Sequence, residues 1–344
     1  MKFIDLFCGI GGFRIAGEQN GLSCVFSSDI DKHVQQAYKA NFNENPFGDL
    51  KEINEDEIPD FDILTAGFPC QPFSYSGKLK GFNDKTRGTL FYDILRILSH
   101  HKPKMFLLEN VKGIVSHNKG DTLNTIITSL IELGYNVHWK IISSLDFGLA
   151  QKRERWYCVG FLDNYDFTFP NPFKLKTPAI KDILEDVPTS QNLGLKNYEL
   201  EMINYHFNSK EIRVKHDSSH YNPNSKKGRH GVYSFLKPDG SLRFHVGDPS
   251  KTQIQEMYYS SIETYSCTII ANRSPKLWDL KRKLSVRECA RLQGFPDWYK
   301  FPCSDTQSFK QIGNSVSVPV VSEILKSMIR VEKEKRKNLT LIEV

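Results

Sequence analysis

The first 180 residues alternate short apolar runs with longer segments in which apolar residues recur at helical spacing. The short runs predict buried strands at residues 3–7, 24–28, 62–66, 105–108, 138–143 and 156–161. The longer segments predict helices at residues 13–20, 33–41, 89–100 and 122–133. Strands that alternate with helices predict an α/β fold with a doubly wound, mostly parallel, Rossmann-like sheet.

The pattern changes after residue 172. From there to about residue 285 the chain is rich in Asn, Ser, Lys and His, which predicts a smaller, loop-rich domain with short strands. Helical spacing returns at residues 285–292 and 318–333. We therefore assign residues 1–180 and 306–344 to one domain, and residues 181–305 to a second domain with its hinge. The charged residues 331–337 are interpreted as a solvated tail.

Basic residues are concentrated in the second region. Residues 205–283 contain 14 Lys or Arg against 7 Asp or Glu, while the whole chain carries a formal net charge of +6. Such an uneven distribution is typical of a surface that binds a polyanion. A solvated surface with chance lysines gives the same composition, so charge alone leaves both interpretations open.

Composition argues against several classes of protein. The sequence contains no run of about 18 apolar residues, so no transmembrane helix is expected. The first residues lack the architecture of a signal peptide. The seven cysteines are odd in number and form no Cys-x-x-Cys pair, so neither a disulfide framework nor a structural zinc site is expected. We predict a cytoplasmic protein with no metal and no membrane partner.

A cysteine lies on the loop after the third predicted strand, where residues 67–74 read GFPCQPFS. Structural cysteines normally lie within apolar periodic segments and pack as small hydrophobic side chains. Cys70 is instead flanked by Pro69 and Pro72, which fix the backbone near the thiol. A loop after a strand is where an α/β enzyme presents a nucleophile. Taken alone, Cys70 remains compatible with either role.

A glycine turn follows the first predicted strand. Gly9, Gly11 and Gly12 allow the backbone to approach a ligand, and the helix that follows offers unpaired N–H groups to an anionic group. Asp29, 20 residues after Gly9, is placed to accept hydrogen bonds from a ribose. The spacing Gly-x-Gly-Gly differs from the dinucleotide pattern Gly-x-Gly-x-x-Gly. It therefore favours a nucleoside with a carboxylate tail, such as S-adenosylmethionine, over NAD.

Three charged residues stand at the ends of later predicted strands. Glu109 follows strand 105–108 on the Cys70 side of the sheet, and with a raised pKa it would protonate a ring nitrogen. A solvated cap or a salt-bridge partner is also compatible with that position. Arg153 and Arg155 precede strand 156–161, and a guanidinium group suits a carbonyl oxygen, a phosphate or a carboxylate. In isolation they would form an ordinary charged loop.

In this order, the motifs resemble those of bacterial DNA (cytosine-5)-methyltransferases of the restriction–modification type. The resemblance spans nearly the whole chain apart from the basic middle region. It rests on the glycine turn and on residues 69–71 (PCQ), 109–111 (ENV), 151–155 (QKRER), 287–296 (RECARLQGFP) and 311–316 (QIGNSV). Six motifs in the family's order are not explained by chance, and no catalytic position departs from the family's pattern.

The resemblance implies a mechanism. The target cytosine would be flipped out of the duplex, because its ring cannot be attacked inside the stack. The Cys70 thiolate would add to C6 while Glu109 donates a proton or hydrogen bond at N3. C5 would then take the methyl group of S-adenosyl-L-methionine. Arg155 would hold the cytosine O2, and Arg153 would support the site.

The resemblance also implies which residues bind the cofactor. Asp29 would bind the ribose, Ile30 one adenine face and Asp49 the adenine amino group. Some members have an aromatic residue at the position of Ile30, so stacking on the adenine is expected to be weaker here. The full set is Phe7, Gly9, Gly11, Gly12, Phe13, Asp29, Ile30, Asp49, Leu50, Pro69, Leu90, Asn314 and Ser315.

The basic region becomes a target recognition domain under the same resemblance, with residues that contact phosphates and read base edges in the major groove. The candidates for DNA contact are Ser76, Arg229, Arg243, Thr268 and Arg273, of which the three arginines are candidates to bond guanine. The loop from Pro69 to about Thr89 would close over the DNA. The expected partner is double-stranded DNA, bound by a monomer in the nucleoid. A restriction endonuclease that cuts the same site would be its counterpart.

Three other functions are compatible with parts of the sequence. A tRNA cytosine-5 methyltransferase shares the scaffold, but that branch carries a Cys-Phe-Thr motif, where residues 266–268 here read SCT, and a compact recognition region. A catalytically inactive DNA-binding regulator would be expected to lose Cys70 or Glu109, and both are present. An NAD-dependent dehydrogenase is disfavoured by the glycine spacing and by the PCQ motif.

Overall fold

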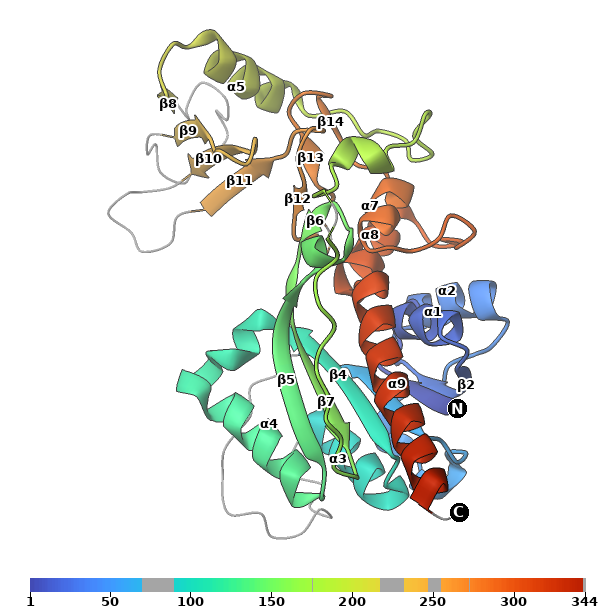
Figure 1. Ribbon diagram of the computed structural model, residues 1–344. Helices are drawn as coiled ribbons and strands as arrows, with labels where there is room; N and C mark the ends of the chain where they lie inside the picture. The colour runs from blue at the N-terminus through green and yellow to red at the C-terminus, as the bar shows by residue number, and fades with distance from the viewer. Residues whose placement is uncertain (70–89, 175, 217–231, 247–254, 272, 343–344) are drawn as a thin grey trace.

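The computed structural model describes residues 1–344 except 70–89, 175, 217–231, 247–254, 272 and 343–344. Its largest unit is a six-stranded sheet with the strand order β2-β1-β3-β4-β7-β5 (Figure 1). The strands are β1 (Lys2–Leu6), β2 (Ser23–Ser28), β3 (Ile63–Gly67), β4 (Met105–Val111), β5 (Asn136–Ser143) and β7 (Glu154–Phe161). Strands β1 to β4 are parallel, and β7 runs antiparallel to β4 and β5. The predicted α/β fold with a mainly parallel sheet is confirmed.

Helices cover both faces of this sheet, because successive side chains of a strand point to opposite sides. Phe3 and Leu107 pack on one face with α1, α2 and α9, whereas Ile4 and Phe106 pack on the other with α3 and α4. The helices are α1 (Gly12–Gln19), α2 (Lys32–Phe42), α3 (Leu90–His101), α4 (Asp121–Glu132) and α9 (Val318–Ile342). These two helical layers make the sheet doubly wound, as predicted.

A smaller antiparallel sheet, with the strand order β11-β10-β9-β8, forms a second lobe (Figure 1). Its strands are β8 (Arg213–His216), β9 (Val232–Leu236), β10 (Leu242–Val246) and β11 (Gln255–Tyr259). Helix α5 (Asn197–Asn208) packs against one face of the sheet through Met202 and Ile203. The sequence pattern predicted the short strands but missed α5, because the buried side of this helix includes the polar residues Glu199 and His206.

The two lobes are joined through short strands and helices. Strand β12 (Ser266–Cys267) pairs in parallel with β6 (Gln151–Lys152), which lies just before β7. A further hairpin consists of β13 (Lys276–Leu277) and β14 (Arg282–Lys283). The chain then returns to the large sheet through α7 (Val286–Leu292) and α8 (Asp305–Asn314), of which only α7 was predicted.

The last helix packs closely along α1 (Figure 1). It extends to Ile342, and its residues Val331 and Glu332 are buried. The Tyr165 hydroxyl donates to Oε2 of Glu332 over 2.8 Å. The interpretation of residues 331–337 as a solvated tail is therefore wrong at its start, because this turn of the helix packs against Tyr165. None of the helices in the described part of the chain is both long and apolar enough to cross a bilayer.

Candidate active site

The glycine turn lies at the carboxyl end of β1. Phe7, Gly9 and Gly11 have φ values of 54°, 51° and 79°, in the left-handed region that favours glycine. The Gly9 N–H donates to Oδ2 of Asp29 over 3.0 Å, and the Asp31 N–H donates to Oδ1 over 2.9 Å. Burial raises the pKa of the Asp29 carboxyl group, and these two donors partly offset the rise. The hydrogen bond between Gly9 and Asp29 thus holds the glycine turn against the end of β2.

Helix α1 begins directly after this turn and contacts the other end of the chain. A Cβ atom on Gly12 would lie 2.7 Å from Cγ2 of Val316 and 2.9 Å from Oγ of Ser315. The N-cap residue is Gly11, and no side chain within the described ranges caps the helix. The first N–H groups of α1 can therefore receive an anionic group.

The other predicted cofactor residues lie around the same edge of the sheet. The backbone at Phe47 pairs with Ser28 at the end of β2 and so brings Asp49 to this edge. Asp49 caps the 3-10 helix Leu50–Glu52, and Ile30 is 66% exposed. The remaining candidates are the buried Phe13 and Leu50, the half-buried Leu90 at the start of α3, and the exposed Pro69 and Asn314.

The predicted acid lies near the end of β4. Glu109 stands opposite Gly67 of β3 and Tyr157 of β7. Gly67 is a close neighbour of the carboxylate, since a Cβ atom there would lie 3.6 Å from Oε2 of Glu109, an ordinary van der Waals contact. Nε of Arg155 lies 3.2 Å from Oε1 of Glu109, and both side chains are largely buried. The structure therefore brings Glu109 and Arg155 together as an ion pair.

Burial controls the ionisation of Glu109. It raises the pKa of the carboxyl group, and the charges of Arg155 and Arg153 offset only part of the rise. Within the described part of the chain Oε1 makes no hydrogen bond, because its contact with Arg155 falls outside hydrogen-bond geometry. Such a carboxyl group keeps its proton to a higher pH than an exposed glutamate and can donate it to a ligand.

Asn110 fixes the start of the segment that carries the predicted nucleophile. Its Nδ2 donates to the carbonyl oxygen of Phe68 over 2.9 Å, inside the protein. Pro69 follows directly. Cys70 and Ser76 belong to residues 70–89 and Arg229 to residues 217–231, so these three predicted site residues lie outside the described residues.

Arg153 differs from Arg155 in its surroundings. It is 3% exposed, and its guanidinium group donates to three carbonyl oxygens, those of Ile269 (3.1 Å), Gly313 (3.2 Å) and Ser315 (2.7 Å). Burial, followed by repulsion from Arg155, lowers the pKa of Arg153 to about 10. These contacts hold backbone segments that are far apart in the sequence, which makes Arg153 a positioning residue.

Two glutamines extend this arrangement, and we call Gln151, Arg153 and Gln293 the buried junction. The Ile269 N–H donates to Oε1 of Gln151 over 2.8 Å, and Nε2 of Gln151 donates to the carbonyl oxygen of Leu292 over 2.9 Å. Nε2 of Gln293 donates to the carbonyl oxygen of Ile312 over 3.0 Å. Gln151 belongs to the QKRER motif and Gln293 to the RECARLQGFP motif, but the sequence pattern does not predict that their side chains join these segments.

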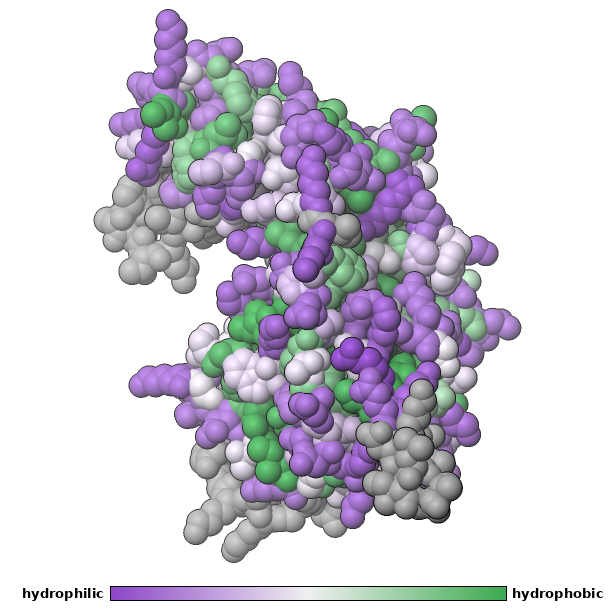
Figure 2. All heavy atoms as spheres, in the orientation of Figure 1, coloured by the Kyte–Doolittle hydropathy of each residue, from purple (hydrophilic) through white to green (hydrophobic). Residues whose placement is uncertain are grey.

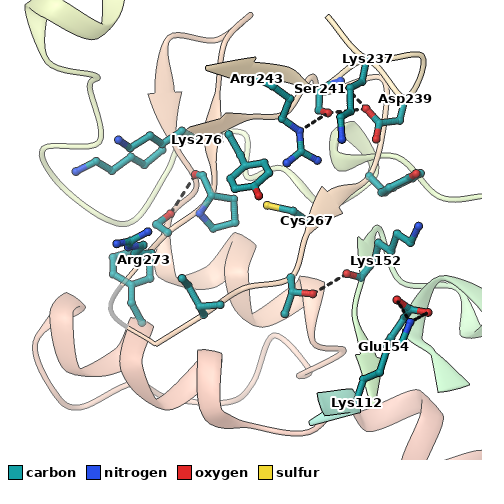
Figure 3. A pocket seen from close by; sticks show the side chains of 18 of the residues that line it. Lys112, Lys152, Glu154, Lys237, Asp239, Ser241, Arg243, Cys267, Arg273 and Lys276 are labelled. Carbon is teal, nitrogen blue, oxygen red and sulfur yellow. Dashed lines mark hydrogen bonds and ion pairs between the residues drawn. The ribbon is translucent and has the colours of Figure 1, made fainter. Parts of the chain in front are cut away.

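A cavity of about 1250 Å³ opens between the two lobes, where Figure 2 shows the surface hollowed. Arg243, Thr268 and Arg273 line it, so the described candidates for DNA contact lie in one place. Figure 3 shows Arg243 and Arg273 among the lining side chains. The six-stranded sheet and its connections contribute Lys112, Lys152 and Glu154. The cavity is basic, because its lining includes seven lysines or arginines and two acidic residues.

Several lining residues were not identified from the sequence. They are Lys112, Lys152, Lys237, Tyr258, Tyr265, Lys276 and Lys283. These positions are scattered over much of the chain and gather only when the two lobes fold against each other. The excess of basic residues between 205 and 283 indicated a surface that binds a polyanion, but it did not indicate which of these residues line the cavity.

The fold is the Rossmann-like fold of methyltransferases. Its architecture matches that of a variant of Spodoptera frugiperda DNMT2 with a TM-score of 0.66 and 19% identity, over 95% of this chain and 99% of that one. A sequence model of C-5 cytosine-specific DNA methylases matches residues 1–330. The chain therefore belongs to the C-5 cytosine-specific DNA methylase family, as its motifs indicated.

Two relatives show the same similarity along almost the whole chain. The Type II methyltransferase M.DsaV of Dactylococcopsis salina is 42% identical over 339 residues, which cover 96% of this chain and 86% of that protein. The Type II methyltransferase M.HhaI of Haemophilus parahaemolyticus is 41% identical over 328 residues, which cover 94% of this chain and 93% of that protein.

Proposed function

We propose that this enzyme methylates C5 of a cytosine flipped out of a short, specific sequence in double-stranded DNA, through a covalent bond between Sγ of Cys70 and C6. The ion pair of Glu109 and Arg155 carries the proposal. It combines a buried carboxyl group of raised pKa with a guanidinium group 3.2 Å away. Asn110, the residue after Glu109, is bonded to the carbonyl group of Phe68, two residues before Cys70.

The edge formed by β1 and β2 fits S-adenosyl-L-methionine. The glycine turn offers backbone without side chains, and the start of α1 would receive a carboxylate. Asp29, held by two N–H donors, would accept the ribose hydroxyl groups, and Asp49 the adenine amino group. Asn314 and Ser315 would close the site. When bound, this cofactor supplies an electrophilic methyl group.

The protein's own residues prepare the cytosine for methylation. The Cys70 thiolate forms the bond to C6, which converts C5 into an enamine-like nucleophile. Glu109 holds a proton at N3, where negative charge develops, and Arg155 donates to O2. After C5 is methylated it loses its proton, and the bond between sulfur and C6 breaks, which restores the thiolate.

The DNA would lie in the basic cavity between the lobes. Residues 1–180 and 306–344 would carry the chemistry, and residues 181–305 would recognise the sequence, with Arg243, Thr268 and Arg273 among the contacts. We infer that the enzyme acts as a monomer, without a metal, in the cytoplasm on nucleoid DNA. Because its relatives are named Type II methyltransferases, its methyl groups would protect DNA from a cognate restriction endonuclease.

A duplex that carries 5-fluorocytosine tests the mechanism, because fluorine at C5 cannot leave as a proton and the bond to sulfur persists. In the presence of S-adenosyl-L-methionine, the wild type should form an adduct that survives denaturation, whereas Cys70→Ser should form none. Cys70→Ser should still bind the labelled cofactor, which shows that it is folded.

Transfer of a labelled methyl group to duplex DNA and to tRNA tests the substrate. We expect labelled DNA and unlabelled tRNA, and bisulfite sequencing of the product locates the modified cytosine. Transfer to tRNA alone would contradict a DNA substrate. Methylation of DNA by Cys70→Ser at the wild-type rate would disprove the covalent mechanism.

A further inference from the structure

The four-stranded sheet of the second lobe has one apolar face and one basic, aromatic face. Its register places Arg213, Phe235, Arg243 and Tyr258 in one row across the strands. Residues directly opposite one another in antiparallel strands point to the same side of the sheet. Leu242 and Phe244, which flank Arg243, are fully buried in the core under α5. The row therefore points away from α5.

Arg243 and Tyr258 are the members of this row that line the cavity between the lobes. The guanidinium carbon of Arg243 lies 3.7 Å from the centroid of the Tyr258 ring, and Nε donates to Oγ of Ser241 over 3.1 Å. Figure 3 shows this hydrogen bond and the guanidinium end of Arg243 inside the cavity. The ring contact and the hydrogen bond together fix the plane of the guanidinium group.

Ser241 is itself held in place by Asp239. Its hydroxyl group donates to Oδ1 of Asp239 over 2.5 Å, and its N–H donates to the same oxygen over 2.9 Å. The hydroxyl proton is committed to Asp239, so the Ser241 oxygen is left to accept from Arg243. An arginine side chain normally loses rotational freedom about several bonds when it binds a ligand. A side chain that is already fixed loses less conformational entropy. Asp239 and Ser241 thus prepare Arg243 for an oriented contact.

We propose that Arg243 reads a guanine of the target sequence by donating two parallel hydrogen bonds to its N7 and O6 atoms in the major groove. This inference rests on the function proposed above. The guanine edge in the major groove presents two acceptors that match a planar guanidinium fork. A phosphate contact needs charge but no fixed plane, and other lysines that line the same cavity, such as Lys152 and Lys237, supply that charge.

Arg213 offers a matched control on the same face of the sheet. Its guanidinium carbon lies 4.7 Å from the centroid of the Tyr233 ring, so it also contacts an aromatic side chain. It is exposed on the edge strand β8, and it is not among the residues that line the cavity. Arg213→Gln therefore removes the same charge from the same face without touching the cavity.

Methylation of a duplex library, randomised around a cytosine and read by bisulfite sequencing, tests the proposal with the full chain. The wild type should prefer guanine at a position near the modified cytosine. Arg243→Gln should reduce that preference about 5- to 150-fold, the range for one bidentate contact, and leave the preferences at other positions unchanged. Arg213→Gln should keep every preference, whatever its overall rate. A uniform loss of rate in Arg243→Gln, with all preferences intact, would overturn the proposal.

Replacing that guanine by 7-deazaguanine removes the N7 acceptor and tests the contact without a protein variant. The wild type should methylate the modified duplex more slowly, and Arg243→Gln should methylate both duplexes alike. A wild type that is indifferent to the substitution overturns the proposal, even where Arg243→Gln fails to fold. A wild type that methylates no duplex at all would instead overturn the proposed function, so the two failures are distinguishable.

Discussion

Asp29 and Glu109 are both buried acids of raised pKa, and their surroundings differ. Each oxygen of Asp29 accepts a backbone N–H, so this carboxylate is held in one orientation as an acceptor. Oε1 of Glu109 receives no hydrogen bond from the described residues and faces the Arg155 guanidinium group instead. The first environment suits a carboxylate that binds hydroxyl groups, and the second suits a carboxyl group that keeps a proton.

The raised pKa of Glu109 predicts how its replacement changes stability with pH. A carboxyl group ionises near pH 4.3 in the unfolded chain and at a higher pH in the folded protein, so between these values the folded state binds more protons. The stability of the wild type therefore falls as pH rises through this window. Glu109→Gln lacks that loss, so the difference in unfolding free energy should shift in favour of the variant as pH rises above about 4.3, the pKa of a glutamate in the unfolded chain.

Urea unfolding at several pH values measures this shift. Glu132→Gln, at an exposed position at the end of α4, should show no comparable shift. Methyl transfer by Glu109→Gln should fall about 10²- to 10⁴-fold, the usual contribution of a general acid. A stability difference that does not change with pH would show that Glu109 has the pKa of an ordinary glutamate.

At the scale of elements, the start of α1 limits the space near the proposed cofactor site. Gly12→Ala adds a Cβ atom within 3 Å of both Ser315 and Val316, and overpacking of this kind costs about 1–3 kcal/mol. We expect the variant to bind S-adenosyl-L-methionine at least tenfold more weakly, because Ser315 must move.

Calorimetric titration of the cofactor into the variant checks this expectation. Gly194→Ala is the control, since its Cβ atom would enter open space, and it should stay within about 0.5 kcal/mol of the wild type in unfolding free energy. Wild-type affinity in Gly12→Ala would show that Ser315 does not shape the binding site.

Elements with strong apolar patterns were predicted well from the sequence. Strands β1, β3 and β4 are almost entirely buried, and apolar residues occupy most of their positions. The antiparallel direction of β7 could not be predicted, because a buried strand has the same pattern in either direction. Helix α5 was missed because Glu199, which accepts from the Tyr259 hydroxyl, lies on its buried side.

The candidate site was predictable to a different extent at each position. The glycine turn and Glu109 lie at the carboxyl ends of strands predicted to be parallel, which already places them on one edge. Arg155 lies at the start of β7 and reaches that edge only because β7 runs antiparallel to β4. Gln151 and Gln293 meet only through tertiary contacts between distant segments. The lining of the cavity likewise depends on how the two lobes pack, and neither periodicity nor charge counts contain that information.

At the scale of the whole molecule, the buried junction joins the cavity to the cofactor edge. Gln151→Leu keeps a similar side-chain volume. It leaves the Ile269 N–H without its acceptor and the Leu292 carbonyl group without its donor. Each buried unsatisfied group costs about 1–3 kcal/mol, so the free energy of unfolding should fall by about 2–6 kcal/mol. The affinities for DNA and for the cofactor should fall as well. The junction is bonded both to the segment beside the cavity and to the segment at the cofactor edge.

Denaturant unfolding and two binding assays on the same preparation test this prediction. Gln191→Leu, the same change at an exposed position, should alter the free energy of unfolding by no more than about 0.5 kcal/mol. If Gln151→Leu loses stability but binds both ligands normally, the junction holds the lobes together without shaping either site.

The packing of α9 against α1 has a consequence for protein synthesis. Asn20, which ends α1, donates to both oxygen atoms of Ser322, 302 residues later in the chain. A ribosome that adds about 5–20 residues per second makes these two partners roughly 15–60 s apart. During that interval α1 has been synthesised without the helix that packs along it. We therefore expect nascent chains to be inactive until α9 has been translated.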